Sequence, residues 1–142
     1  MGIVLDASVT LAWLVERIDA VEIRLANDVL HGIQAADAVV PSLWFPEISN
    51  GILMAERTGE VKPAQSALFL DLVDTLPIAE DRTQSASVRA TTLTLARAYG
   101  LTAYDATYLE LALRTRRTLA TFDRQLADAT RKAGGRVFGD RS

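Results

Sequence analysis

The chain has 142 residues, a formal net charge of −3, 49% hydrophobic residues and no cysteine. This length and composition predict one globular domain over residues 1–142 with a core of its own. The lack of cysteine excludes disulfides, thiolate metal sites and a cysteine nucleophile, and it favours a reducing, cytoplasmic location. Residues 1–15 have no basic leader and are interrupted by Asp6, so we expect neither a signal peptide nor a membrane span.

The predicted elements alternate between short apolar strands and helices. The first half predicts a strand at 2–6, helices at 9–16 and 20–35, a strand at 37–41 and a helix at 43–59, with Ser8 and Ser42 as N-caps of the first and third helices. The second half predicts helices at 63–73, 83–99, 101–117 and 124–135, and strands at 75–81, 118–123 and 136–139. Gly59 and Gly100 are expected to end the helices that precede them.

This alternation indicates an α/β fold with a central, mainly parallel sheet of four to five strands. The strands are continuously apolar, as is typical of a parallel sheet covered by helices on both faces. Ligands of such sheets gather beyond the carboxyl ends of the strands. The acidic residues near those ends are therefore the candidates for a functional site.

Asp6 ends the first strand and Asp123 ends the strand at 118–123, so both are expected at the same edge of the sheet if these strands are parallel. Each has a structural alternative: Asp6 fits turn chemistry, and Asp123 fits the N-cap of the helix that begins at Arg124.

Asp105 lies near the start of the helix at 101–117. At about 100° per residue, Glu110 and Arg114 share a polar face on which they form an i,i+4 pair toward solvent, and Asp105 points away from that face. One interpretation is a capping box between Thr102 and Asp105; the other is a carboxylate held on the inner face for chemistry.

Glu47 repeats this pattern, because it lies opposite Glu56 on its helix and shares a side with Leu43, Asn50, Gly51 and Met54. A buried carboxylate must be paired, protonated or bound to a metal, and basic partners are scarce in residues 1–70. Two like charges ~6 Å apart cost roughly 3 kcal/mol at an effective dielectric of about 20, so four converging acids require a counterion.

Oxygen ligands select Mg²⁺ or Mn²⁺, since His31 is the only histidine and lies on a separate helix. Such a site suits metal-assisted hydrolysis of a phosphodiester. The segment 114–136 carries seven basic and two acidic side chains, which predicts contacts to a nucleic-acid backbone, with a solvated surface as the alternative. The candidate backbone contacts are Arg114, Arg116, Arg117 and Arg124.

Four fragments, VLDAS, PEISNGI, AYDATYLELA and TLATFDRQL, occur in an order and spacing that resemble the PIN domain, and most closely the VapC-type toxins of toxin–antitoxin pairs. The resemblance covers essentially the whole chain and implies a PIN-like three-layer α/β/α sandwich. It implies a Mg²⁺-dependent endoribonuclease that hydrolyses RNA, forms a homodimer, and is inhibited by a cognate antitoxin in a heterotetramer or larger assembly.

The resemblance also implies residue roles. The acidic quartet around the metal corresponds to Asp6, Glu47, Asp105 and Asp123, with Ser8, Asn50 and Thr121 orienting these ligands. The alternatives are a PIN nuclease of RNA processing without an antitoxin, and an inactive PIN-like binding domain. Phosphoaspartate enzymes fit poorly, because Ser8 stands where a haloacid-dehalogenase phosphatase needs a second aspartate, and no lysine suits a receiver domain.

Overall fold

The computed structural model describes residues 2–141 and contains one five-stranded sheet. Every strand pairs in parallel with its neighbours, which confirms the α/β class and the parallel sheet. The strands lie in the order β3-β2-β1-β4-β5 and are β1 (Ile3–Leu5), β2 (Ala38–Pro41), β3 (Ile78–Asp81), β4 (Thr118–Ala120) and β5 (Arg136–Val137).

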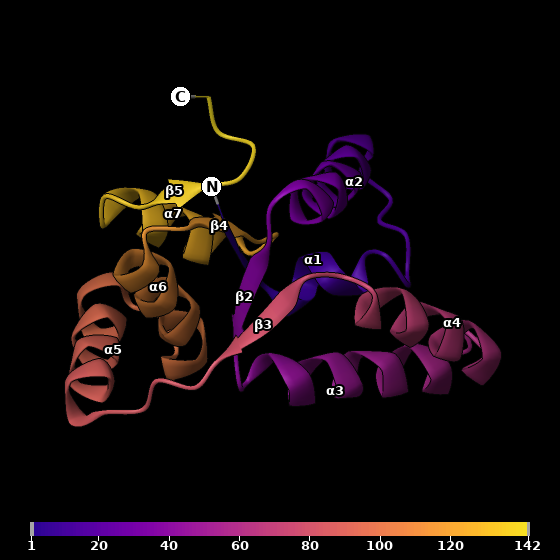
Figure 1. The fold of residues 1–142 in the computed structure, drawn as a ribbon, viewed down its shortest axis with the longest axis horizontal. Coiled ribbons are helices and arrows are strands. Elements are labelled where there is room, and N and C mark those ends of the chain that lie inside the picture. The colour runs from indigo at the N-terminus through magenta and orange to yellow at the C-terminus, as the bar shows by residue number, and fades with distance from the viewer. Residues whose placement is uncertain (1, 142) are drawn as a thin grey trace.

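Helices cover both faces of this sheet and complete a three-layer α/β/α arrangement (Figure 1). The first four helices lie together on one side: α1 (Ala7–Leu11), α2 (Ala20–Ala35), α3 (Trp44–Arg57) and α4 (Pro63–Asp74). The last three lie on the other side: α5 (Ala86–Tyr99), α6 (Ala103–Thr115) and α7 (Arg124–Lys132). The chain moves outward from β1 to β3 and then returns to β4, and the right-handed rule for parallel crossovers places helices of these two directions on opposite faces of the sheet. None of the helices in the described part of the chain is long and apolar enough to cross a membrane.

The core is centred on β1 and β4, whose apolar side chains are removed from solvent on both faces. Val4, Leu5 and Leu119 are fully buried, as expected for inner strands of a doubly covered sheet. These two strands are neighbours in the sheet but not in the sequence. Between them the chain forms β2 and β3 on one side of β1 and then crosses back to the other side. Their carboxyl ends therefore form the topological switch point, where ligands bind in open α/β folds.

Several predicted boundaries hold and two predicted caps are wrong. Helix α2 has the predicted bounds, and Gly100 ends α5 in a left-handed conformation with φ 64°. Ser8 does not cap the first helix: the N-cap is Asp6, and α1 begins at Ala7 and ends at Leu11 rather than spanning 9–16. Ser42 does not cap α3, whose N-cap is Leu43. Each of the two serines follows a strand end closely, and there the path of the chain, not the hydroxyl, decides where the helix begins.

The strands are shorter than the apolar runs that predicted them. The third begins at Ile78 rather than at 75, the fourth ends at Ala120 rather than at 123, and the fifth ends at Val137. The fourth matters for the site, because Asp123 lies three residues beyond β4, at the N-cap of α7, instead of ending the strand.

Candidate active site

Asp6 follows β1 directly and lies at the switch point. Its carboxylate is only 8% exposed, and its Oδ2 accepts hydrogen bonds from Ser8 Oγ at 2.8 Å and from Thr121 Oγ1 at 2.5 Å. Burial raises the pKa of Asp6, and these hydroxyl donors oppose the rise. Ser8 and Thr121 therefore orient the Asp6 carboxylate from two strand ends that are 115 residues apart in the sequence.

The loop between β4 and α7 is tied to the same group of residues. Ser8 Oγ accepts from the backbone N–H of Phe122 at 3.1 Å, and Thr121 Oγ1 accepts from that of Asp123 at 3.0 Å. Asp123 caps α7, because its Oδ1 accepts from the backbone N–H of Leu126 at 3.0 Å. The structural alternative for Asp123 is thus realised, and within residues 2–141 its other carboxylate oxygen accepts no hydrogen bond.

Asp105 lies in the first turn of α6 and is half-buried. Thr102 caps this helix by accepting a hydrogen bond from the backbone N–H of Asp105 at 3.1 Å. Burial raises the pKa of the Asp105 carboxyl, and the negative charges of Asp123 and Asp6 raise it further, while Thr102 opposes the rise. Asp105 therefore lies in the capped first turn of α6, close enough to Asp6 and Asp123 for their charges to act on its carboxyl.

Glu47 reaches this group from α3, on the opposite layer. Its Oε1 accepts a 2.5 Å hydrogen bond from the Oη of Tyr108 on α6. Burial raises the pKa of the Glu47 carboxyl, and the charges of Asp6 and Asp105 add to this effect, against the hydrogen bond from Tyr108. Charge repulsion thus links Glu47 to Asp6 and Asp105, and it links Asp105 to Asp6 and Asp123.

No lysine or arginine among the described residues forms an ion pair with any of these four acids. As the side chains lie, residues 2–141 contain no group of three histidine, cysteine, aspartate or glutamate side chains that could hold a metal ion. Three of the acids accept hydrogen bonds from neutral groups. Ser8 and Thr121 hydroxyls donate to Asp6, the Tyr108 hydroxyl donates to Glu47, and a backbone N–H of α7 donates to Asp123. The oxygen donors and the uncompensated charge fit a hard divalent cation, whose binding would bring these acids closer together.

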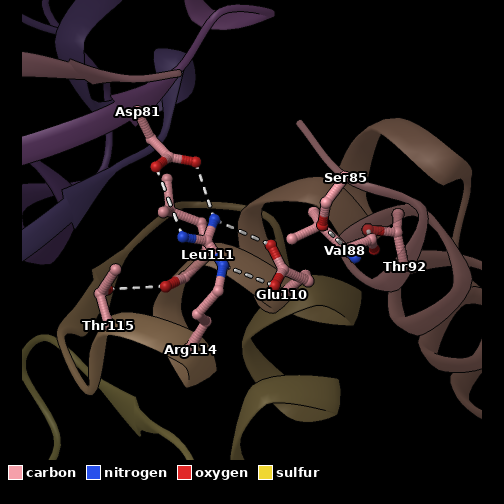
Figure 2. Close-up of polar contacts among 8 residues, drawn as sticks. All are labelled: Asp81, Ser85, Val88, Thr92, Glu110, Leu111, Arg114 and Thr115. Atoms are coloured by element: carbon pink, nitrogen blue, oxygen red, sulfur yellow. Dashed lines mark hydrogen bonds and ion pairs between the residues drawn. The ribbon is translucent and has the colours of Figure 1, made fainter. Parts of the chain in front are cut away.

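A second acidic cluster on α6 corrects the prediction for Glu110. This residue does not face solvent: it is 5% exposed, and both of its oxygens accept hydrogen bonds from Arg114. Figure 2 shows Arg114 between Glu110 and Asp81. Asp81 is the last residue of β3 and lies at its carboxyl end. Helix α5 packs against α6, and Asp81 at the end of β3 pairs with Arg114, so the face that helical periodicity assigned to solvent is covered.

The predicted RNA-contacting arginines do not share one location. Arg114 is occupied by Glu110 and Asp81, and Arg117 pairs with Asp37, which lies just before β2. Arg116 and Arg117 directly precede β4, so they lie at the amino edge of the sheet, opposite the acids. Arg124, next to Asp123, is exposed at the acidic edge.

Asn50 stands apart from the other predicted orienting residues. It is exposed on α3 and makes no hydrogen bond with the acids within the described chain.

Two residues near the acids, Tyr108 and Arg17, were not predicted from the sequence. Tyr108 is 1% exposed and directs its hydroxyl to Glu47. Arg17 pairs with Glu22 at 2.8 Å and lies over the ring of Phe122, 4.7 Å from its centre. The spacing of Asp105 and Tyr108, three residues apart on one helix, is a signal for the tyrosine. Arg17 gave none, because its loop reaches Phe122 only in the folded chain.

Solved structures resemble this fold at low sequence identity. The crystal structure of PAE2754 from Pyrobaculum aerophilum has a TM-score of 0.69 at 22% identity, covering 96% of this chain and 83% of that one. FitAcB from Neisseria gonorrhoeae has a TM-score of 0.63 at 17% identity, covering 98% and 97%. A toxin–antitoxin complex from Klebsiella pneumoniae has a TM-score of 0.57 at 16% identity, covering 87% of each chain.

A search of curated proteins finds no significant match to this chain. The model of the PIN domain, however, matches residues 3–132. This match includes all four predicted acids and every strand except β5. The chain therefore belongs to the PIN domain family, whose members are generally nucleases.

Proposed function

We propose that this chain is a single PIN domain that acts as a Mg²⁺-dependent endoribonuclease. The observation that carries the proposal is the group of four acids at the switch point, which have no arginine or lysine paired with them in the described chain. Within this group, the charges of Asp6 and Asp105 raise the pKa of Glu47, and those of Asp123 and Asp6 raise the pKa of Asp105. Uncompensated carboxylates of this kind attract a divalent cation, and perturbed pKa values gather at functional sites.

The proposed roles follow from the positions of the side chains. Asp6 and Asp105 are the principal ligands, and Asp123 and Glu47 bind directly or through water. Ser8 and Thr121 hold Asp6 in orientation through the hydrogen bonds to its Oδ2. A bound Mg²⁺, or Mn²⁺ in its place, supplies a more acidic water and neutralises charge on the phosphate.

The same edge of the sheet offers groups for an RNA chain. Arg124 is exposed beside Asp123, and Arg17 is fixed over Phe122 by its pair with Glu22. We assign phosphate contacts near the cleavage position to Arg17 and Arg124. Arg116 and Arg117 remain available only to more distant phosphates, because they lie at the amino edge, and Arg114 is occupied internally.

We further propose that the nuclease is the toxin of a toxin–antitoxin pair. The fold is shared with a chain from a toxin–antitoxin complex of Klebsiella pneumoniae, which supports this assignment. A protein partner and a homodimer also agree with large apolar side chains that are exposed on α3 and α4. These side chains are Phe45, Leu53, Met54, Leu68, Leu70 and Leu72.

The test of the nuclease is RNA cleavage with Mg²⁺ and with EDTA, comparing wild type with Asp6→Asn and Asp105→Asn. We expect cleavage only with the metal, and a loss of roughly 10³-fold in each variant, because several kcal/mol of transition-state stabilisation is removed. Glu110→Gln is the matched control on the same helix and should stay within a few-fold of wild type. Metal-independent cleavage, or full activity in both aspartate variants, contradicts the mechanism.

The test of the toxin role is expression in cells. A toxin arrests growth, and co-expression of the small protein encoded beside it restores growth. A nuclease that cleaves RNA in vitro without arresting growth belongs to RNA processing instead. A chain that binds Mg²⁺ but cleaves no RNA is a PIN-like binding domain.

A further inference from the structure

Tyr108 connects the two helical layers at the acidic site. It belongs to α6, on one side of the sheet, and donates its hydroxyl to Glu47 of α3, on the other side, at 2.5 Å. The two residues are 61 positions apart in the sequence. Its ring is 1% exposed and is packed in the central core. The hydroxyl is thus the one polar atom of a core side chain, and it is directed at an acid of the site.

Filling the core does not explain this hydroxyl. A phenylalanine ring would occupy the same space, whereas a buried phenol hydroxyl requires a partner. The phenol O–H is a donor and the Glu47 carboxylate is an acceptor, so the hydrogen bond runs from Tyr108 Oη to Glu47 Oε1. A donor fixed in this way selects one orientation of Glu47.

We propose that Tyr108 is a positioning residue that holds the Glu47 carboxylate toward the cation. The inference rests on the proposed metal site, and it adds a residue to which no role was assigned. Tyr108 Oη donates its hydrogen bond to Glu47 Oε1, which leaves Oε2 for the cation or for a water bound to it.

The position of Tyr108 on α6 gives this role its geometry. Tyr108 lies three residues after Asp105, so both side chains leave the helix on neighbouring sides. One helix therefore carries a proposed ligand and the donor that orients a second ligand from α3. The repulsion of Asp6 and Asp105 acts against Glu47 in this position, and the hydrogen bond from Tyr108 opposes it.

The experiment measures the affinity of the whole chain for Mn²⁺ and Mg²⁺ by isothermal titration calorimetry, without RNA. Tyr108→Phe removes only the hydroxyl, and we expect it to weaken cation binding about tenfold, the lower end of the effect of losing a group that orients a metal ligand. Tyr104→Phe is the matched control: it is the same substitution one turn earlier on α6, at a side chain that is 65% exposed. It should leave the affinity unchanged.

A double-mutant cycle with Glu47→Gln separates positioning from a general effect on the fold. If Tyr108 acts through Glu47, Tyr108→Phe weakens binding in the wild-type background and adds little in the Glu47→Gln background. Equal losses in both backgrounds overturn the inference, as does unchanged affinity in Tyr108→Phe. Circular dichroism melts of all four proteins identify any variant that is unfolded at the temperature of titration, and the measurement is then repeated at a lower temperature.

Failure of this inference is distinguishable from failure of the proposed function. A wild-type chain that binds the cation but cleaves no RNA contradicts the nuclease and leaves the Tyr108 cycle intact. A chain that cleaves RNA with Mg²⁺, and whose affinity for Mg²⁺ does not depend on Tyr108, contradicts only the positioning role. A wild-type chain with no affinity for either cation overturns both.

Discussion

Two acidic clusters share helix α6, and they differ in whether the protein supplies a cation. Asp105, in the first turn, faces Asp123 and Asp6, and its pKa is raised. Glu110, five residues later, is more deeply buried and is held by Arg114, which also binds Asp81. Burial alone would raise the pKa of Asp81, but hydrogen bonds from Arg114 and Thr83 and the charge of Arg114 hold it below its usual range.

The comparison shows that burial of an acid does not by itself identify a functional site. The cluster of Glu110 contains its own counterion, so it stabilises the contact of α6 with the end of β3. The cluster of Asp105 has none among the described residues, so its repulsion is a cost to the fold that a ligand can relieve. The two clusters therefore predict opposite responses to the same kinds of substitution.

The largest expected effect on stability is the loss of Arg114. Arg114→Met keeps the apolar stem but leaves Glu110 buried without a partner, so we expect the free energy of unfolding to fall by about 2 kcal/mol; this is below the ~3–5 kcal/mol of a fully buried pair because Arg114 is partly exposed. Urea denaturation measures it. Adding Glu110→Gln to this variant should restore part of the loss. If Arg114→Met is as stable as wild type, the cluster is not a stabilising contact.

The same cluster should give a pH dependence of known sign. Because the pKa of folded Asp81 is lowered, its contribution is fully present above the unfolded value of about 4 and is lost as the pH falls through the lower folded value. The difference in stability between wild type and Arg114→Met should therefore shrink as the pH falls from about 5 to about 2. A difference that stays constant over this range contradicts the assignment.

Asp105→Asn should have the opposite effect, since it removes repulsion instead of a partner. In EDTA, we expect this variant to be more stable than wild type by about 1 kcal/mol, which corresponds to roughly 2–4 °C in Tm. Millimolar Mg²⁺ should raise the Tm of wild type more than that of the variant, because a ligand stabilises the state that binds it. A destabilised variant in EDTA would indicate that Asp105 serves mainly to start α6.

The smallest effect compares one arginine at each edge of the sheet. In the Asp105→Asn background, which should not cleave, Arg124→Gln is expected to weaken binding of single-stranded RNA a few-fold and to lower the salt dependence by about one phosphate contact. Arg116→Gln, at the amino edge, should change neither the affinity for RNA nor its salt dependence. Fluorescence anisotropy from about 50 to 200 mM KCl measures both. Equal effects would place RNA along the whole basic segment.

The positions of the acids could be predicted from the sequence, because the carboxyl end of each strand lies near the end of its apolar run and parallel strands share an edge. This reasoning placed Asp6 correctly, and it placed Asp123 near the right edge although β4 stops at Ala120. It failed for the basic segment, where residues close in sequence were expected to act together. Arg116 and Arg124 are separated by the length of β4 and its following loop, so the fold places them at opposite edges.

The sequence by itself determined the order of the elements, the α/β class, the PIN-domain pattern and the restriction to oxygen ligands, because these depend on local periodicity and on which side chains are present. The tertiary structure alone decided which acids are paired with an arginine. Helical periodicity directed Glu110 to solvent, but α5 and β3 cover that face and bring Asp81 to Arg114. Only packing of distant helices joins Tyr108 to Glu47. Such pairings depend on how the helical layers pack across the sheet, and local sequence patterns do not encode contacts between residues that are far apart in the chain.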